Sequence, residues 1–340
     1  MPVLYRTYRP VKWSDVVGQD QIVTALNDAI TSKHVSHAYL FSGSRGTGKT
    51  SVARIMARAL KTADEDVYEI DAASNRGIDD IRHLREHVAV LPFSSAYKVY
   101  IIDEVHMLSK DAWNALLKTL EEPPAHVIFI LATTELDKVP ETIISRCQTF
   151  SFRRPSRDVI RLHVADIAKK EKCDLDAGAA DLIALLGDGS FRDALGTLEK
   201  VIASSGGKSG KISRTDVEAV TGAPRAELVN KFIEQVTAKD ADKALATLGQ
   251  AVESGLSMSI FTTLVLEKMR FILLAQNSPS SKSQVQGRTS EDDMRFILSM
   301  ADKKVMTTTL LSIFIQASLE IGRTPIESLP LELAVVKFCV

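Results

Sequence analysis

Short apolar runs recur between residues 38 and 134, and segments with helical spacing separate them. The runs "AYLFSG", "VYEIDA", "KVYIIDE" and "HVIFILATT" are rich in β-branched and aromatic residues, which is typical of buried strands. They predict strands over 38–43, 67–72, 98–104 and 126–134. Apolar strands that alternate with helices indicate a parallel sheet covered on both faces, so we expect an α/β fold.

Helices are predicted between these strands. Residues 50–60 have helical spacing directly after the first strand, and residues 109–124 carry apolar side chains on one helical face. Ser109 is a favourable N-cap for the second helix, and Pro123 and Pro124 should end it because proline cannot continue a helix.

The strand pattern is lost after residue 155. Residues 156–222 have the pattern of short helices, and residues 223–340 are again helical apart from a polar stretch at 277–293. We therefore expect an α/β domain over 1–155, a small helical domain over 156–222 and an all-α domain over 223–340.

The composition is that of a globular protein. Of the 340 residues, 45% are hydrophobic and 25% charged, with Lys+Arg 42 against Asp+Glu 43. The near-zero net charge argues against unspecific nucleic-acid binding over the whole surface, although it permits a local basic patch. The chain lacks the roughly 20 consecutive apolar residues of a membrane span, and its N-terminus lacks a signal-peptide core, so we expect a cytoplasmic protein.

The three cysteines, Cys147, Cys173 and Cys339, lie far apart and form no Cys-x-x-Cys pair. This spacing does not fit a zinc site, and disulfides are rare in the cytoplasm. We expect all three to pack as small apolar side chains. Whether Arg146, which directly precedes Cys147, carries a function stays open at this point.

The segment "GSRGTGKT" at 43–50 matches the phosphate-binding pattern Gly-x-x-x-x-Gly-Lys-[Ser/Thr] between a predicted strand and a helix. Its backbone N–H groups and the helix N-terminus should surround phosphate oxygens. Lys49 should reach the β- and γ-phosphates, and the Thr50 hydroxyl should bind Mg²⁺. The expected nucleotide contacts here are Gly43, Arg45, Gly46, Thr47, Gly48, Lys49, Thr50 and Ser51.

The predicted strand over 98–104 ends in Asp103 and Glu104. Ligands of open α/β sheets bind at the carboxyl ends of the strands, so both carboxylates should face the phosphate-binding loop. We expect Asp103 to hold Mg²⁺ together with Thr50, and Glu104 to orient and deprotonate an attacking water. The two motifs together indicate ATP hydrolysis.

A set of longer motifs extends this interpretation. In chain order they are "RPVKWSDVVGQ", "HAYLFSGSRGTGKTS", "EIDAASNRGIDDIR", "IIDEVHMLS", "NALLKTLEEPP", "ILATT", "ISRC" and "GSFRDAL". With them the chain closely resembles the gamma/tau subunits of bacterial DNA polymerase III clamp loaders over about residues 9–195. The resemblance implies an AAA+ ATPase domain, a helical lid and an oligomerising collar.

The resemblance also implies roles for residues outside the phosphate-binding loop. Arg146 corresponds to an arginine finger that enters the ATP site of a neighbouring subunit, and Arg192 to a second sensor that touches the γ-phosphate. Thr134 is the favoured first sensor, although Thr133 precedes it in the same motif. The arm around the adenine corresponds to Tyr8, Arg9, Pro10, Val16 and Val17.

A DNA-facing segment is implied at 71–87, where Asn75, Arg76 and Arg82 are expected to follow the backbone of primer–template DNA. The alternative is a solvated helix face, since acidic residues are interspersed among these arginines. Few aromatic residues accompany them, so base stacking is not expected.

The implied function is that of an ATP-hydrolysing motor that opens a sliding clamp and loads it on primer–template DNA in the replisome. Expected partners are delta- and delta-prime-type subunits, the clamp and further copies of this chain, with no membrane. One feature of the family, a four-cysteine zinc module after the first helix, is missing from "KTADEDVYEI", so we expect ATP and Mg²⁺ but no zinc. The alternatives are a non-catalytic scaffold subunit and an AAA+ Holliday-junction motor.

Overall fold

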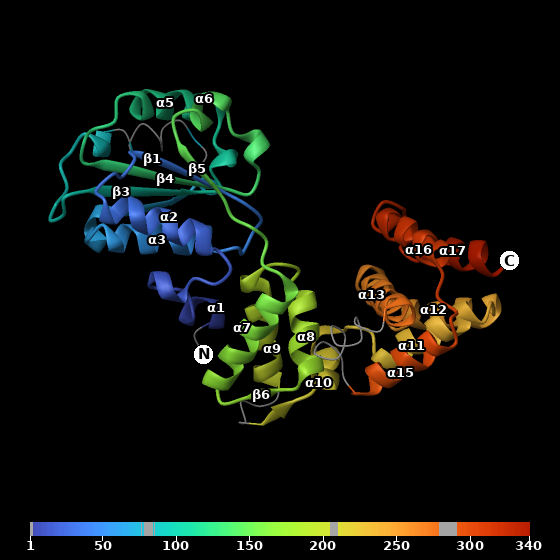
Figure 1. Ribbon diagram of the computed structural model, residues 1–340. Coiled ribbons are helices and arrows are strands. Elements are labelled where there is room, and N and C mark those ends of the chain that lie inside the picture. Colours follow the sequence, from blue (N-terminus) through green and yellow to red (C-terminus); the bar gives the residue numbers. More distant parts are fainter. Residues whose placement is uncertain (1–2, 76, 78–83, 85, 205–209, 279–290) are drawn as a thin grey trace. The chain divides into compact units, whose positions relative to one another are not determined.

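The computed structural model describes residues 3–75, 77, 84, 86–204, 210–278 and 291–340, and it divides into two compact units (Figure 1). Unit 1 consists of Met1–Ile160 and Gly187–Gly196, and unit 2 of Arg161–Leu186 and Thr197–Val340. In the described part of the chain, unit 1 contains the large sheet and unit 2 is built mainly from helices.

A five-stranded parallel sheet forms the centre of unit 1, in the order β2-β3-β4-β1-β5. Its strands are β1 (Ala38–Ser42), β2 (Val67–Asp71), β3 (Lys98–Asp103), β4 (Val127–Thr133) and β5 (Gln148–Ser151). The first four fall on the predicted segments, so the prediction of a parallel sheet is confirmed. β5 escapes the prediction because it lies at the edge of the sheet and is largely exposed, and therefore lacks a continuous apolar run.

Helices cover both faces of the sheet, as predicted. Figure 1 shows α2 (Asp20–Thr31) and α3 (Lys49–Ala59) on one face, and α5 (Lys110–Glu121) and α6 (Glu141–Ile144) on the other. Each face has its own buried core. Side chains of the first core include Leu26, Phe41, Met56 and Ile130, and those of the second include Leu40, Leu116, Phe129 and Ile143.

The predicted boundaries of α5 are also confirmed. The Ser109 hydroxyl accepts a hydrogen bond from the Ala112 N–H at 3.2 Å, which satisfies one of the free donors at the start of the helix. The helix ends at Glu121, shortly before Pro123. Short-range sequence signals therefore fix both ends of this helix.

Four helices follow the sheet: α7 (Arg157–Lys170), α8 (Ala177–Leu186), α9 (Phe191–Ser204) and α10 (Arg214–Thr221). Both α7 and α9 begin in unit 1 and continue in unit 2. The helical expectation for this region is correct except for a short parallel pair, β6 (Asp174–Leu175) and β7 (Lys211–Ile212). Two residues per strand are too few to produce an alternating pattern in the sequence.

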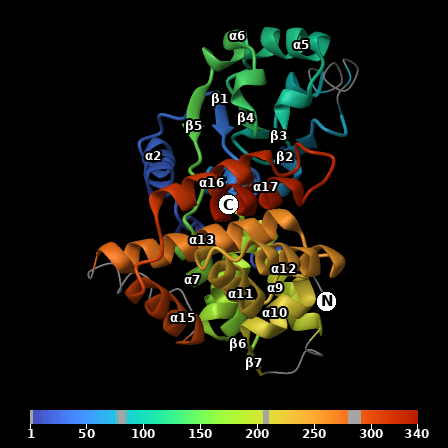
Figure 2. The same ribbon diagram turned by 90° about the vertical axis from the view of Figure 1, so that its right-hand side faces the viewer.

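In the part of the chain that the structure describes, six further helices form the C-terminal part of unit 2 (Figure 2). They are α11 (Ala226–Thr237), α12 (Ala241–Glu253), α13 (Met258–Asn277), α15 (Glu291–Asp302), α16 (Thr308–Glu320) and α17 (Leu329–Cys339). Phe232 of α11 packs edge-on against Phe261 of α13 at 5.3 Å and Phe314 of α16 at 6.0 Å between ring centroids. Both ends of the expected polar stretch at 277–293 belong to helices, and residues 279–290 lie outside the described residues.

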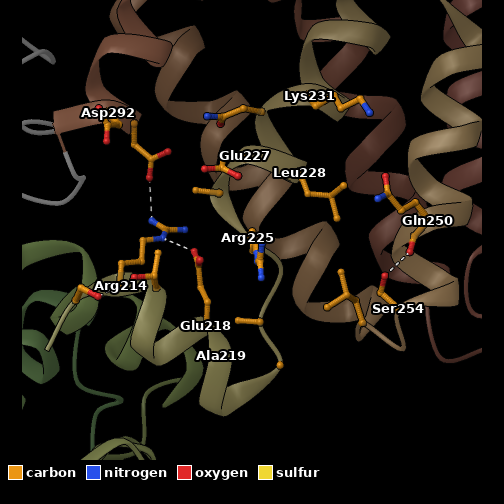
Figure 3. A pocket seen from close by; sticks show the side chains of 18 of the residues that line it. Arg214, Glu218, Ala219, Arg225, Glu227, Leu228, Lys231, Gln250, Ser254 and Asp292 are labelled. Carbon is orange, nitrogen blue, oxygen red and sulfur yellow. Dashed lines mark hydrogen bonds and ion pairs between the residues drawn. The ribbon is translucent and has the colours of Figure 1, made fainter. Parts of the chain in front are cut away.

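A charged network is buried in unit 2, beside a cavity of about 1000 Å³ (Figure 3). Asp293 of α15 accepts hydrogen bonds from Arg214 at 2.9 Å and from Lys268 at 2.6 Å. Arg214 also pairs with Glu218 at 2.9 Å, and Lys268 donates to the Asn230 amide oxygen at 2.5 Å. In these contacts two cations meet two carboxylates, which favours burial of the network, and the same contacts link α10 to the C-terminal helices.

Candidate nucleotide-binding site

The phosphate-binding loop connects β1 to α3 and requires glycine at specific positions. Gly46 has φ +74°, and a Cβ added there would lie 2.0 Å from the Ser190 hydroxyl oxygen. A Cβ on Gly43 would lie 2.5 Å from the Phe152 carbonyl oxygen. The N-terminus of α3 has no side-chain cap, so its N–H groups are free to meet phosphate oxygens.

Lys49 is buried at the start of α3, and its ammonium donates to the carbonyl oxygens of Gly43 at 2.7 Å and Ser44 at 3.0 Å. The pKa of Lys49 lies below its ordinary value, mainly because the side chain is buried. The negative charges of Glu104 and Asp103 partly oppose this shift, and the positive charge of Arg192 adds to it. Carbonyl groups of the predicted phosphate-binding loop therefore hold the Lys49 ammonium in place.

The two expected Mg²⁺ ligands lie together. The Thr50 hydroxyl donates to Asp103 Oδ2 at 2.7 Å, which joins the start of α3 to the end of β3. A hydroxyl and a carboxylate are the hard oxygen donors that Mg²⁺ takes, usually with water and phosphate oxygens completing the shell. Within the described residues, no group of three or more His, Cys, Asp or Glu side chains could hold a metal by itself.

Glu104 has a left-handed backbone conformation (φ 48°, ψ 44°), and the Thr134 hydroxyl donates to its Oε2 at 2.9 Å. Thr133 instead is buried and lies 3.1 Å from His106 Nδ1. Of the two threonines, Thr134 is therefore the one that contacts the expected base. His106 packs at the end of the strand, and its Nε2 lies 3.2 Å from Glu135.

Arg192 lies at the start of α9, in unit 1. The Phe191 N–H donates to the Gly46 carbonyl oxygen at 3.2 Å, which places this helix start beside the phosphate-binding loop. The Arg192 guanidinium lies 5.5 Å from the centre of the Tyr5 ring. Tyr5 was not expected from the sequence, because an aromatic residue five positions from the N-terminus carries no motif of its own.

The N-terminal arm places Arg9 near the same charges. Burial is the main cause that lowers the pKa of Arg9, with the positive charge of Arg54 next, while Glu69 raises it. Val16 packs against the core beneath α2 and α3, and Val17 is 38% exposed.

Gln19 also lies at this site, although no motif predicts a role for it. It is buried, and its Nε2 donates to the Arg153 carbonyl oxygen at 2.8 Å and to that of Thr47 at 3.4 Å. Its Oε1 accepts from the Arg153 N–H at 3.2 Å. One side chain thus joins the phosphate-binding loop to the segment after β5. The available signal was its place at the end of "RPVKWSDVVGQ".

Arg146 follows α6, and its partners come from α5 and α6. Nη1 donates to the Thr142 carbonyl oxygen and Nη2 to Glu121 Oε1, both at 2.7 Å. Cys147 packs against the core under α5, as expected, and burial raises the pKa of its thiol to about 11. The thiol therefore stays protonated at neutral pH, which argues against a role as nucleophile or metal ligand.

The expected DNA contacts are only partly described. Asn75 donates to the Asp71 carbonyl oxygen through its backbone N–H at 2.9 Å and through Nδ2 at 3.0 Å. Arg76 and Arg82 lie outside the described residues. The choice between a DNA-facing segment and a solvated helix face therefore stays a prediction.

Comparison with known proteins covers nearly the whole chain. Residues 18–75 and 64–156 match the family model "DNA polymerase III, delta subunit", and residues 159–207 match the lid domain of DNA polymerase III clamp loader subunits. Residues 212–340 match domain III of DNA polymerase III subunits gamma and tau.

Curated relatives belong to the same group of DNA polymerase III subunits as the matching family models. The chain is 39% identical to DNA polymerase III subunit tau of Bacillus subtilis over 99% of its own length and 63% of that protein. Identity to the gamma/tau subunit of Mycoplasma pneumoniae is 45%, over 64% of this chain and 34% of that protein. Identity to DNA polymerase III subunit tau of Escherichia coli is 37%, over 82% of this chain and 46% of that protein. The chain thus spans between a third and two thirds of the length of these relatives.

Among solved structures, the RuvB Holliday junction branch migration motor of Thermotoga maritima has a TM-score of 0.54 at 20% identity, over 67% of this chain and 79% of that one. At this identity the likeness shows the fold alone. With the matched lid and C-terminal domains, it confirms the prediction of an AAA+ α/β fold followed by helical parts.

Proposed function

The chain belongs to the gamma/tau subunit family of DNA polymerase III, and from this premise we propose that it is an ATP-hydrolysing motor subunit of a clamp loader. It would open a sliding clamp and load it on primer–template DNA. The observation that carries the proposal is that side chains expected to act in hydrolysis lie together at the carboxyl ends of the strands: Lys49, Thr50 with Asp103, and Glu104 with Thr134. A scaffold subunit would have no need of this set.

Each residue has a role in this proposal. Lys49 binds the β- and γ-phosphates, and the loop and α3 N–H groups hold their remaining oxygens. Thr50 and Asp103 hold Mg²⁺, which would neutralise phosphate charge. Glu104 accepts the proton of the attacking water, and the hydrogen bond from Thr134 at 2.9 Å fixes which way its carboxylate points.

Arg192 and Arg146 complete the site from two directions. Arg192 senses the γ-phosphate in the same chain, supported by its position at the start of α9 beside Gly46. Arg146 enters the site of a neighbouring subunit, where a guanidinium can meet the transferring phosphoryl group with two hydrogen bonds. The arm with Tyr8, Arg9, Pro10, Val16 and Val17 lines the adenine.

This role requires partners. We assign residues 1–155 to the ATPase domain, 156–222 to the lid and 223–340 to the collar that joins subunits. Partners are delta- and delta-prime-type subunits, copies of this chain, the clamp and the backbone of primer–template DNA at the segment with Asn75, Arg76 and Arg82. Exposed apolar side chains available for protein contacts are Leu91, Phe93, Ile315, Leu319, Leu333 and Val336.

Localisation follows from the same role. We place the protein in the cytoplasmic replisome, with ATP and Mg²⁺ and no zinc. Among the described residues, none of the helices combines the length and apolar character needed to cross a membrane.

The test is ATP turnover by the chain assembled with its delta-type partners and clamp, with and without primed DNA. We expect primed DNA to stimulate turnover, and Lys49→Ala to abolish it by removing the phosphate-binding cation. A fully assembled complex without turnover would contradict the motor role and favour the scaffold.

A further inference from the structure

Glu121 occupies an unfavourable position in its own helix. It is the last residue of α5, where the free carbonyl groups give the helix end a partial negative charge that disfavours a carboxylate. The next residue, Glu122, adds a second negative charge. Local helix stability therefore does not explain the carboxylate at position 121.

The contact that Glu121 makes supplies a reason. Its Oε1 accepts a hydrogen bond from Arg146 Nη2 at 2.7 Å, while Arg146 Nη1 donates to the Thr142 carbonyl oxygen at 2.7 Å. Two acceptors from separate helices thus bind the two terminal nitrogens of one guanidinium. This fixes the plane of the group as well as its position.

The Arg146–Glu121 ion pair remains accessible to solvent. The side chains of Arg146 and Glu121 are 35% and 49% exposed, so another molecule can reach the guanidinium. A guanidinium carries five N–H donors, and the bonds to Thr142, Glu121 and the Ser145 hydroxyl (3.4 Å from Nη1) leave others for phosphate oxygens. An arginine restrained from one side and open on the other is suited to meet a ligand on a second subunit.

We propose that Glu121 is a positioning residue for Arg146, orienting the guanidinium for the γ-phosphate of the neighbouring subunit. The inference rests on the proposed function of Arg146 as a finger in trans. In this role Glu121 contacts neither the nucleotide nor the attacking water. Glu121 restrains the Arg146 side chain in advance, so less conformational entropy is lost when the guanidinium meets the γ-phosphate. It therefore raises kcat without contributing to ATP binding.

The experiment compares Glu121→Ala, Glu121→Gln and Arg146→Ala in the assembled clamp loader with clamp and primed DNA. Glu122→Ala is the matched control, since it removes a carboxylate from the same helix end. Turnover is measured against ATP concentration, and thermal melting of each chain checks that it folds as the parent does.

We expect Glu121→Ala to lower kcat on the order of tenfold with KM for ATP unchanged. Glu121→Gln should recover most of the loss, because its amide oxygen still accepts from Nη2. Glu122→Ala should match the parent, and Arg146→Ala should lose about 10³-fold.

Three outcomes overturn the inference. If Glu121→Ala keeps the parent kcat while Arg146→Ala is inactive, the finger is real but Glu121 does not position it. If Glu121→Ala raises kcat, the pair restrains the finger instead of aligning it. If Arg146→Ala keeps the parent kcat, the proposed finger fails and the role of Glu121 with it.

Discussion

Substitution of Asp293 tests the buried network of unit 2. Asp293 is 2% exposed and lies between Lys268, 8% exposed, and Arg214, 15% exposed. Asp293→Asn keeps the shape of the side chain but removes its charge. Two cations then share a single carboxylate, Glu218, in place of two.

The expected cost follows from that imbalance. Removal of one partner from a buried ion pair costs about 3–5 kcal/mol, because a charge is left without compensation. Burial already lowers the pKa of Lys268, so loss of its proton would limit the penalty and we expect the lower end, about 3 kcal/mol. Lys268→Met leaves an excess of negative charge in the network and should also lower the free energy of unfolding.

The double variant Lys268→Met with Asp293→Asn provides the decisive comparison. It restores neutrality, with Arg214 facing Glu218 alone, so its cost should be smaller than the sum of the single costs by about 1–3 kcal/mol. The assay is urea unfolding followed by helical circular dichroism. Lys243→Met, which breaks an exposed pair with Asp240, is the control and should leave the midpoint unchanged. The reasoning would be refuted if the two single costs add up in the double variant. It would also be refuted if Asp293→Asn lowers the free energy of unfolding by less than about 1 kcal/mol.

Three further predictions concern unit 1. Gly46→Ala should abolish nucleotide binding measured by equilibrium titration, because its Cβ would lie 2.0 Å from Ser190 Oγ and its φ is +74°. Cys147 should react with iodoacetamide at pH 8 far more slowly than a free thiol, since burial raises its pKa to about 11; rapid alkylation of the folded chain would contradict this. Asp66 is buried, which by itself raises its pKa, but N–H donors from Phe93, Ser94 and Ser95 outweigh burial and lower it. The folded-state pKa is thus below the unfolded value of about 3.9, so this stabilisation is present above pH 4 and is lost as the pH falls through the lower pKa. Asp66→Asn should flatten the acid dependence of the urea midpoint, and an unchanged slope would show that other carboxylates dominate.

The parts of the fold that the sequence predicts are those with strong local signals. The central strands β1, β3 and β4 are mostly apolar because both of their faces are covered, and Ser109 marks the start of α5 by its own hydroxyl. β5 has mostly exposed side chains at the sheet edge, so its pattern resembles that of a loop.

The site divides in the same way. Lys49 and Thr50 are part of one linear motif, so the sequence alone predicts them as site residues. Gln19 meets Arg153 across 134 positions of the chain, and Glu121 meets Arg146 across 25. Neither pair has a periodicity or a spacing rule, since only the packing of the sheet and its helices brings the partners together.

The central claim is that ATP bound by one copy is hydrolysed with the arginine of another. The most direct test mixes Lys49→Ala chains, which keep Arg146, with Arg146→Ala chains, which keep the phosphate-binding loop, in one assembled clamp loader. Complexes built from either variant alone should be inactive with primed DNA. The mixture should regain part of the parent turnover, because Lys49→Ala copies present Arg146 to ATP held by their neighbours. A mixture as inactive as its components, or full activity of Arg146→Ala alone, would contradict the account.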